Sequence, residues 1–271
     1  MARTKLKKTS IRRSAQELAQ LAADWHMRNT AWSAELMDWL RQTDPDWVDE
    51  VYRLLSQDVP ASAGDISGFV DAYLIWHSEL EPETPAVVSY IAASDPLHLV
   101  KRHPWLKAQM ASWLSIWKIE QTWPGQGLLL CDLLTDEERH VWDPRASAQW
   151  EPEQVILARV VDVDQGVHFL ADAYPQALSI MEALEVGEFF LSSLAPRRRK
   201  LRPKDLRASK VFLALTRLWI CHLASLDPEA PRASSPPKAQ VELLDEEPGF
   251  TDEEFGELMR LLELVQNRTL A

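Results

Sequence analysis

Glycine and cysteine are scarce in this chain. Only 8 of its 271 residues are glycine, which is about 3% against a usual ~7%, so a glycine-rich loop that cradles phosphate is not expected. The two cysteines, Cys131 and Cys221, lie far apart in the sequence. Small secreted domains held together by disulfides carry many more cysteines. The cysteine content therefore argues against a disulfide framework and fits a reducing cytoplasm.

Neither a leader nor a membrane span is predicted. The first residues are basic and are not followed by an apolar stretch, unlike a signal peptide. The longest apolar stretch, Val211 to Leu226, contains Arg217 and His222 and is too short and too polar to cross a bilayer. We therefore expect a cytoplasmic protein that stays out of the membrane.

Common catalytic motifs are also absent. The chain has no G-x-S-x-G, no H-E-x-x-H and no phosphate-binding loop, and its two cysteines are not spaced as zinc ligands. We expect no enzyme activity, no cofactor and no metal. The remaining enzymatic alternative is an acid/base group at one edge of the predicted barrel, made by Asp132, Asp136, Glu137, Glu138 and His140. Charged turn residues that face water are the simpler interpretation.

Positive charge is concentrated in two short segments of the chain. The net charge is −12, yet residues 1–13 hold six basic residues and no acid, and residues 197–210 hold eight basic residues and one acid, Asp205. The rest carries 15 basic against 40 acidic residues. Such asymmetry indicates partners rather than fold. The candidate residues for binding nucleic acid or another polyanion are Arg3, Lys5, Lys7, Lys8, Arg12, Arg13, Arg197, Arg198, Arg199, Lys200, Arg202 and Lys204.

One stretch, residues 114–171, has the pattern of a sheet. Five apolar runs are separated by turns rich in Gly, Pro and Asp, and they are Leu114–Thr122, Leu128–Leu134, His140–Trp142, Val155–Val163 and Val167–Ala171. This pattern predicts a small five-stranded antiparallel β-barrel, SH3-like or OB-like, because an open sheet of this size would leave long unpaired edges. The predicted fold class is α+β, mainly α-helical, with this barrel inserted between helical segments.

Residues 14–113 are predicted to be helical wherever they are ordered. Ser14 and Glu17 form a capping box, and Leu18, Trp25, Trp32 and Trp39 then recur every seven residues. Such a stripe is typical of a face buried against another helix; a base-stacking surface is the alternative. Pro104 predicts a helix break, with a separate helix over Pro104–Trp113.

Four further segments follow the barrel. Residues 172–226 are predicted to form helices joined by a basic loop at 196–204, and residues 227–249 form a linker rich in proline and acid. Residues 250–271 are predicted to form an amphipathic docking helix. Its candidate docking residues are Phe255, Leu258, Leu262 and Val265.

The barrel region resembles a family of bacterial proteins that often end in a SEC-C motif. The shared pattern is P-G-x-G at Pro124–Gly127, L-x-D-L-L-T at Leu130–Thr135, Ala146-Ser147, and L-A-R-V-V at Leu157–Val161. The resemblance covers roughly residues 69–166 and implies a similar helical lead-in and barrel. The Cys-rich zinc motif of that family is missing here, so the resemblance implies no metal and little about function.

Three functions remain open. The first is a non-enzymatic adaptor or regulatory subunit that binds another protein of a bacterial assembly. The second is a nucleic-acid-binding accessory protein that uses the basic segments 3–13 and 197–210. The third is an enzyme that uses the barrel-edge carboxylates. The acidic run at 242–257 also invites the hypothesis that it folds back on Arg197–Lys204 and masks that loop.

Overall fold

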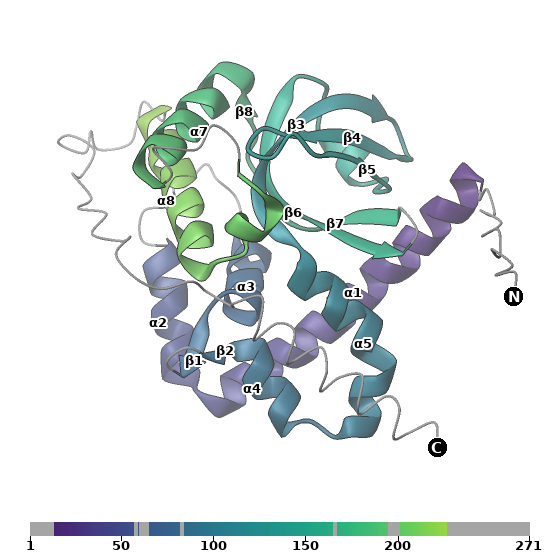
Figure 1. Ribbon diagram of the computed structural model, residues 1–271, viewed down its shortest axis with the longest axis vertical. Helices are drawn as coiled ribbons and strands as arrows, with labels where there is room; N and C mark the ends of the chain where they lie inside the picture. Colours follow the sequence, from purple (N-terminus) through teal and green to yellow (C-terminus); the bar gives the residue numbers. More distant parts are fainter. Residues whose placement is uncertain are drawn as a thin grey trace, which may run out of the picture.

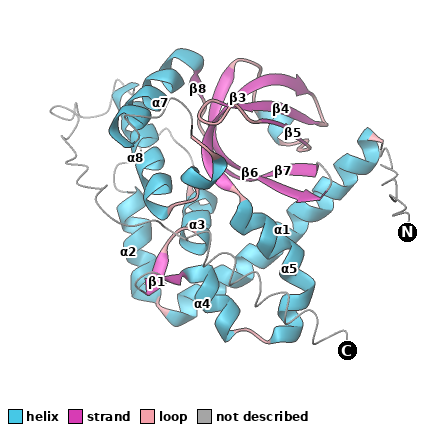
Figure 2. Cartoon of the chain, in the orientation of Figure 1, coloured by secondary structure: helices cyan, strands magenta, loops and turns pink. Residues whose placement is uncertain are grey.

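The computed structural model describes residues 14–56, 59, 65–81, 84–164, 167–194 and 201–226. The predicted basic arm, the linker and the docking helix lie outside the described residues. Within them, the fold is the predicted α+β combination, mainly helical with one small closed barrel (Figures 1 and 2). The helices are α1 (Ala15–Thr43), α2 (Pro45–Ser56), α3 (Ser67–Trp76), α4 (Ala86–Ala93), α5 (Pro96–Ala111), α6 (Ala146–Gln149), α7 (Ile180–Leu194), α8 (Ser209–Leu226) and the 3-10 turn η2 (Pro203–Leu206).

All five predicted barrel strands are present. They are β3 (Trp113–Trp123), β4 (Gly127–Asp132), β5 (Glu138–Val141), β6 (Gln154–Asp164) and β7 (Val167–Ala173), and β8 (Leu178–Ser179) extends the sheet beside β6. The strand order is β3-β4-β5-β7-β6, and β6 pairs back onto β3 from Trp113↔Val160 to Lys118↔Val155. The predicted closure of the barrel is confirmed.

The prediction that every neighbouring pair of barrel strands is antiparallel was wrong for one pair. Strands β5 and β7 run parallel and pair at Val141↔His168, where the Trp142 N–H also donates to the His168 carbonyl at 3.0 Å. The reason is arithmetic. Strand directions cannot alternate around a closed ring with an odd number of strands, so a five-stranded barrel needs at least one parallel pair.

The two glycines of the P-G-x-G turn are needed for different reasons. Gly125 lies at φ 73°, which side chains rarely adopt. Gly127 begins β4, and a Cβ there would lie 2.1 Å from the Val141 carbonyl oxygen on β5. The close approach of two backbones, rather than the turn itself, therefore requires glycine at position 127.

Replacing Gly127 with alanine should destabilise the barrel strongly. The new methyl group meets backbone atoms that cannot rotate away, so β4 and β5 must separate, at an expected cost of about 3 kcal/mol. Gly68→Ala is a matched control, because a Cβ at Gly68 in α3 meets nothing within 4 Å and should stabilise the helix slightly. Urea unfolding of the two variants measures the difference. Equal stability of the two variants would contradict this prediction, because it would show that β4 and β5 can separate at position 127 at little cost.

The tryptophan stripe of α1 faces the interior of the protein, with Trp25 buried and Trp32 and Trp39 half-buried, and it meets two kinds of surface. Trp32 packs edge-on against Trp105 of α5 at 5.1 Å between ring centroids, and Trp39 against Tyr90 of α4 at 5.5 Å. Leu18, near the start of the helix, instead packs against the barrel residues Trp142 and Val167. In Figure 1, α1 accordingly passes beside β7 at one end and beneath the other helices at the opposite end.

The predicted helix break at Pro104 was wrong. Helix α5 continues from Pro96 to Ala111 with Pro104 inside it. Pro104 is exposed, whereas Trp105 and Leu106 are fully buried. The carbonyl that loses its helical hydrogen bond can therefore bond water, and the buried side chains hold both halves of the helix in line.

The expectation that residues 14–113 are all helical was also too simple. A short two-stranded ribbon, β1 (Glu79–Glu81) and β2 (Thr84–Pro85), lies between α3 and α4. Asp95 caps α5 just before Pro96, since the Asp95 carboxylate accepts a hydrogen bond from the Leu97 N–H at 2.9 Å. One continuous core then runs from Trp25 to Leu223 and joins helices and barrel.

Candidate functional site

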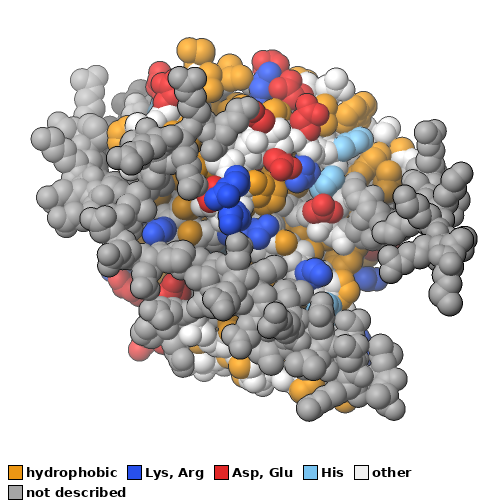
Figure 3. All heavy atoms as spheres, viewed as in Figure 1, with side chains coloured by type: hydrophobic (Ala, Val, Ile, Leu, Met, Phe, Trp, Pro, Cys, Tyr) orange, Lys and Arg blue, Asp and Glu red, His pale blue; other side chains and the backbone are white. Residues whose placement is uncertain are grey.

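Most of the candidate site residues lie outside the described residues. These are Arg3, Lys5, Lys7, Lys8, Arg12, Arg13, Arg197, Arg198, Arg199 and Lys200, together with Phe255, Leu258, Leu262 and Val265. Arg202 and Lys204 are described and exposed. The Arg202 guanidinium is engaged by the Asp205 carboxylate, with an N–O distance of 3.0 Å. Figure 3 shows Lys and Arg side chains gathered near the centre of one face, over the segment that carries η2.

Of the five barrel-edge candidates, Asp132 lies inside the protein, whereas Asp136 and Glu138 are exposed and Glu137 and His140 are half-buried. Asp132 is fully buried, and its carboxylate accepts hydrogen bonds from Trp113 Nε1 at 3.0 Å, Ser115 Oγ at 2.6 Å and the Leu134 N–H at 2.9 Å. Burial raises the pKa of Asp132, and these donors work in the opposite direction. Asp132 therefore holds the turn after β4 together, since its acceptor sites face these internal donors and not a substrate.

The described residues contain no group of three His, Cys, Asp or Glu side chains that could hold a metal ion. Cys131 is half-buried and Cys221 is exposed, and the two do not form a disulfide. Burial raises the pKa of the Cys131 thiol, which lowers its reactivity as a nucleophile.

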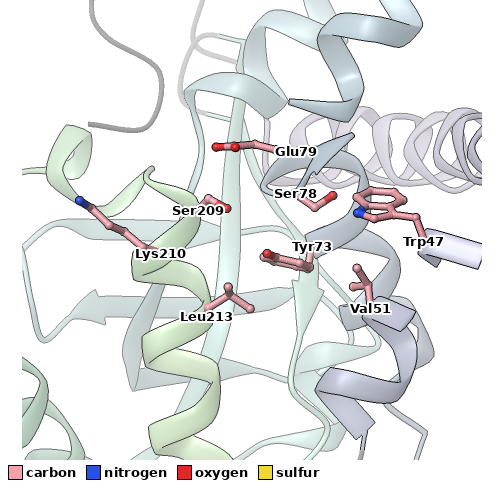
Figure 4. A pocket seen from close by; sticks show the side chains of 8 residues that line it. All are labelled: Trp47, Val51, Tyr73, Ser78, Glu79, Ser209, Lys210 and Leu213. Carbon is pink, nitrogen blue, oxygen red and sulfur yellow. The ribbon is translucent and has the colours of Figure 1, made fainter. Parts of the chain in front are cut away.

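A cavity of about 360 Å³ opens between α2, α3, β1 and α8. We call it the α2–α8 cleft, and Figure 4 shows its lining: Trp47, Val51, Tyr73, Ser78, Glu79, Ser209, Lys210 and Leu213. Trp47 and Val51 stand on one side, Lys210 and Leu213 on the other, and Tyr73 lies between them. Its volume is within the range of small-ligand pockets, about 300–1,000 Å³.

Local sequence explains how each wall forms. Asp44 caps α2, accepting a hydrogen bond from the Trp47 N–H at 3.0 Å, and Trp47 and Val51 then share a face because they are four residues apart. Lys210 and Leu213 share a face of α8 in the same way. Helix α8 packs against α3 through Phe212, whose ring lies 5.3 Å from Tyr73 and 4.6 Å from His77.

The floor of the cleft is apolar with one hydroxyl. Tyr73 is buried, and burial is the main reason that its pKa is raised. The Glu79 carboxylate raises this pKa further, whereas the Ser209 hydroxyl and Arg217 lower it. Charged groups of both signs therefore lie close to the hydroxyl, and Tyr73 remains protonated at neutral pH.

The rim of the cleft is polar and well ordered by hydrogen bonds. Ser78 Oγ donates to the Leu74 carbonyl at 2.5 Å, and Ser209 Oγ donates to the His77 carbonyl. Glu79 is exposed, and Ser209 and Lys210 are half-buried. Lys210 extends outward along the α8 side of the rim (Figure 4).

The lining of the cleft can bind an apolar group next to a polar one. The eight described residues that line the cleft include no histidine or cysteine, so no nucleophile with an adjacent imidazole base is present. Apolar walls from Trp47, Val51 and Leu213 can instead take up an apolar side chain, and the rim can bond a polar backbone or a carboxylate.

Sequence reasoning missed the cleft. The helices that form it, α2 and α8, begin at Pro45 and Ser209, and nothing local indicates that they meet. The one available signal was Trp47, a large aromatic residue in the first turn of a short helix, which is half-buried.

Comparison with protein-family models, with curated proteins and with solved structures finds no match to this chain. The resemblance to SEC-C-associated proteins therefore stays an expectation, and the function must be argued from the residues themselves. Among the described residues, α8 alone is long and apolar enough to cross a membrane by length and composition, a criterion that core helices also meet. Phe212, Leu215 and Trp219 of α8 are fully buried in the protein core.

Proposed function

We propose that this chain is a non-enzymatic adaptor or regulatory subunit of a bacterial cytoplasmic assembly, and that it holds its protein partner in the α2–α8 cleft. The observation that carries the proposal is the cleft itself. It is an open cavity with apolar walls and a polar rim, and its described lining residues include no histidine or cysteine.

The chemistry of the cleft and its surroundings defines the partner. Residues 202–210 contain Arg202, Lys204, Arg207 and Lys210 against the single acid Asp205, and Lys210 belongs to the cleft lining. An acidic segment would be attracted to this side. The Trp47 and Leu213 walls require an aromatic or aliphatic anchor on the same segment. The proposed partner is therefore an acidic amphipathic segment of another protein.

The cleft makes a specific prediction for partner capture. Leu213→Asp places a charge on a half-buried apolar wall and should reduce the amount of retained partner at least tenfold, because the anchor would have to desolvate a carboxylate. Leu184→Asp is the matched control, because Leu184 is an exposed apolar residue of α7 that does not line the cleft. The measurement is affinity capture with the full chain as bait, followed by binding assays with each purified candidate.

Three results of this comparison decide the proposal. A protein that binds the wild type and Leu184→Asp equally, but not Leu213→Asp, supports it. A protein that binds all three chains equally contradicts it. Loss of binding after nuclease treatment would favour the alternative, in which segments 3–13 and 197–210 contact nucleic acid. The pairing of Arg202 with Asp205 leaves that guanidinium less available for phosphate.

A further inference from the structure

We propose that the α2–α8 cleft is occupied by the chain's own C-terminal segment, residues 250–271, with Phe255 as the anchor that a partner must displace. This inference rests on the proposed function of the cleft as a docking site. It adds the identity of the resting occupant and a means of regulation.

Part of the apolar lining of the cleft is not covered by described residues. Trp47 and Leu213 are half-buried: each packs partly against the core and leaves part of its side chain at the cleft. The cavity between them, about 360 Å³, is large enough for one aromatic side chain and part of another group. A segment that inserts an apolar side chain would remove this surface from water.

Residues 250–271 supply an anchor of the required kind. Thr251 and Glu254 form a capping-box pattern, and Phe255, Leu258, Leu262 and Val265 recur at the spacing of one helical face. An isolated helix of this length is marginal in water, so its apolar face needs a surface to pack against. The cleft offers one such surface on the same chain.

The connecting chain has a suitable length. Helix α8 has 18 residues, and it begins at the cleft and ends at Leu226. At about 1.5 Å per residue, the end of the helix lies roughly 20 Å from Leu213. The next 23 residues, 227–249, include five prolines, and an extended proline-rich chain spans about 3.1 Å per residue, so the segment is long enough to bring residues 250–271 back to the cleft. A tether that reaches the site raises the effective concentration of the segment there, although less so as the tether exceeds the span.

Charge complementarity fixes the orientation of the segment. Residues 242–257 contain eight acidic residues and no basic residue, whereas Lys210 lines the α8 side of the cleft and Arg202, Lys204 and Arg207 precede it closely in the sequence. Glu79, on the β1 side of the rim, would repel this run. The acidic run should therefore lie along η2 and the start of α8, and the Phe255 face should enter the cleft beside Leu213.

The experiment uses a labelled synthetic peptide of residues 242–271 and the full chain. In the wild type the tethered segment competes with the peptide, so binding should be weak. In full-length Phe255→Asp the cleft is vacated, and the peptide should bind at least tenfold more tightly by fluorescence anisotropy. Leu264→Asp is the matched control, because it adds the same charge on the opposite side of the predicted helix and should behave as the wild type. Adding Leu213→Asp to Phe255→Asp should abolish the gain.

Each outcome decides between the possibilities. Equal peptide affinity for the wild type and Phe255→Asp, or no binding by either, overturns the inference. A dimer of the wild type that Phe255→Asp dissociates would mean that the segment enters the cleft of a second copy, which also overturns the intramolecular version. Partner capture that depends on Leu213 but is unchanged by Phe255→Asp would leave the adaptor proposal standing alone. If the peptide binds as expected but no partner is captured through Leu213, the inference about residues 250–271 would stand and the adaptor proposal would fail.

Discussion

Replacing Arg159 with alanine should lower the free energy of unfolding by about 3–5 kcal/mol, a large part of the ~5–15 kcal/mol that usually separates folded and unfolded states. Arg159 lies on β6 and is almost completely buried. Its guanidinium donates to the Asp172 carboxylate of β7, with an N–O distance of 2.8 Å. The alanine variant would leave that carboxylate without its cationic partner, and urea unfolding at pH 7 measures the cost.

Arg159 also joins the barrel to the helices beneath it. Its guanidinium donates to Gln109 Oε1 of α5 at 2.7 Å and to Ser112 Oγ at 3.2 Å. Gln109 Nε2 in turn donates to Asn29 Oδ1 of α1 at 2.6 Å, and Trp105 Nε1 donates to the same oxygen at 3.0 Å. Loss of one side chain would thus leave several buried polar groups without a partner, and each of these is costly.

Two further variants separate the role of the charge from that of packing. The double variant Arg159→Met/Asp172→Leu removes both charges and should recover at least half of the loss, because apolar replacements of a buried ion pair are often well tolerated. Arg53→Ala removes an exposed arginine that pairs with Glu50 within α2 and should have little effect. A loss below about 1 kcal/mol for Arg159→Ala would contradict a structural role for the network.

Local signals explain why most of the fold could be predicted. The barrel strands end at turns that are marked by turn-forming residues, such as Gly125 at φ 73°. These residues allow the strand ends to be predicted to within a few positions. The capping box of Ser14 and Glu17 marks the start of α1 in the same way, and so does Asp95 followed by Pro96 for α5. The direction of β5 against β7 is different, because it depends on how many strands the closed ring contains and not on any nearby residue.

Contacts between distant segments explain what could not be predicted. The α2–α8 cleft depends on helices from opposite ends of the described chain, and the path of α5 through Pro104 depends on which face is buried. The Arg159 network left one visible sign, because Arg159 is the single charged residue in the apolar run from Val155 to Val161. A charge in such a run indicates a buried partner, but not that the partner would be Asp172.

The stability of the protein should fall as the pH falls below about 6.5, and His77 should account for a large part of this loss. His77 follows α3 and is buried against the ring of Phe212 at 4.6 Å. Among the described residues, neither of its ring nitrogens has a hydrogen-bond partner. Burial, with a smaller effect of the Arg159 charge, lowers the pKa of His77 to about 3, and the nearby Arg207 backbone offsets part of this effect.

The sign of this pH dependence follows from whether the folded or the unfolded state binds the His77 proton more tightly. In the unfolded chain the pKa of histidine is about 6.5, so between pH 6.5 and 3 the unfolded state takes up a proton that folded His77 refuses. The contribution of His77 to the free energy of unfolding is therefore largest above pH 6.5, and it declines by about 1.4 kcal/mol per pH unit below that pH. At pH 5 the expected loss from this one residue is about 2 kcal/mol.

Replacing His77 with phenylalanine isolates this contribution. The phenyl ring can keep the contact with Phe212 and has no nitrogen to leave unbonded, so the variant should be at least as stable as the wild type at pH 7.5. Burial also lowers the pKa of His140 and of His168, so some pH dependence will remain in the variant. The test is therefore the difference between the two chains, measured by urea unfolding at pH 7.5 and 5.0. An equal loss of stability in both would rule out His77 as the source, and His77→Leu provides a second variant if the larger ring disturbs the core.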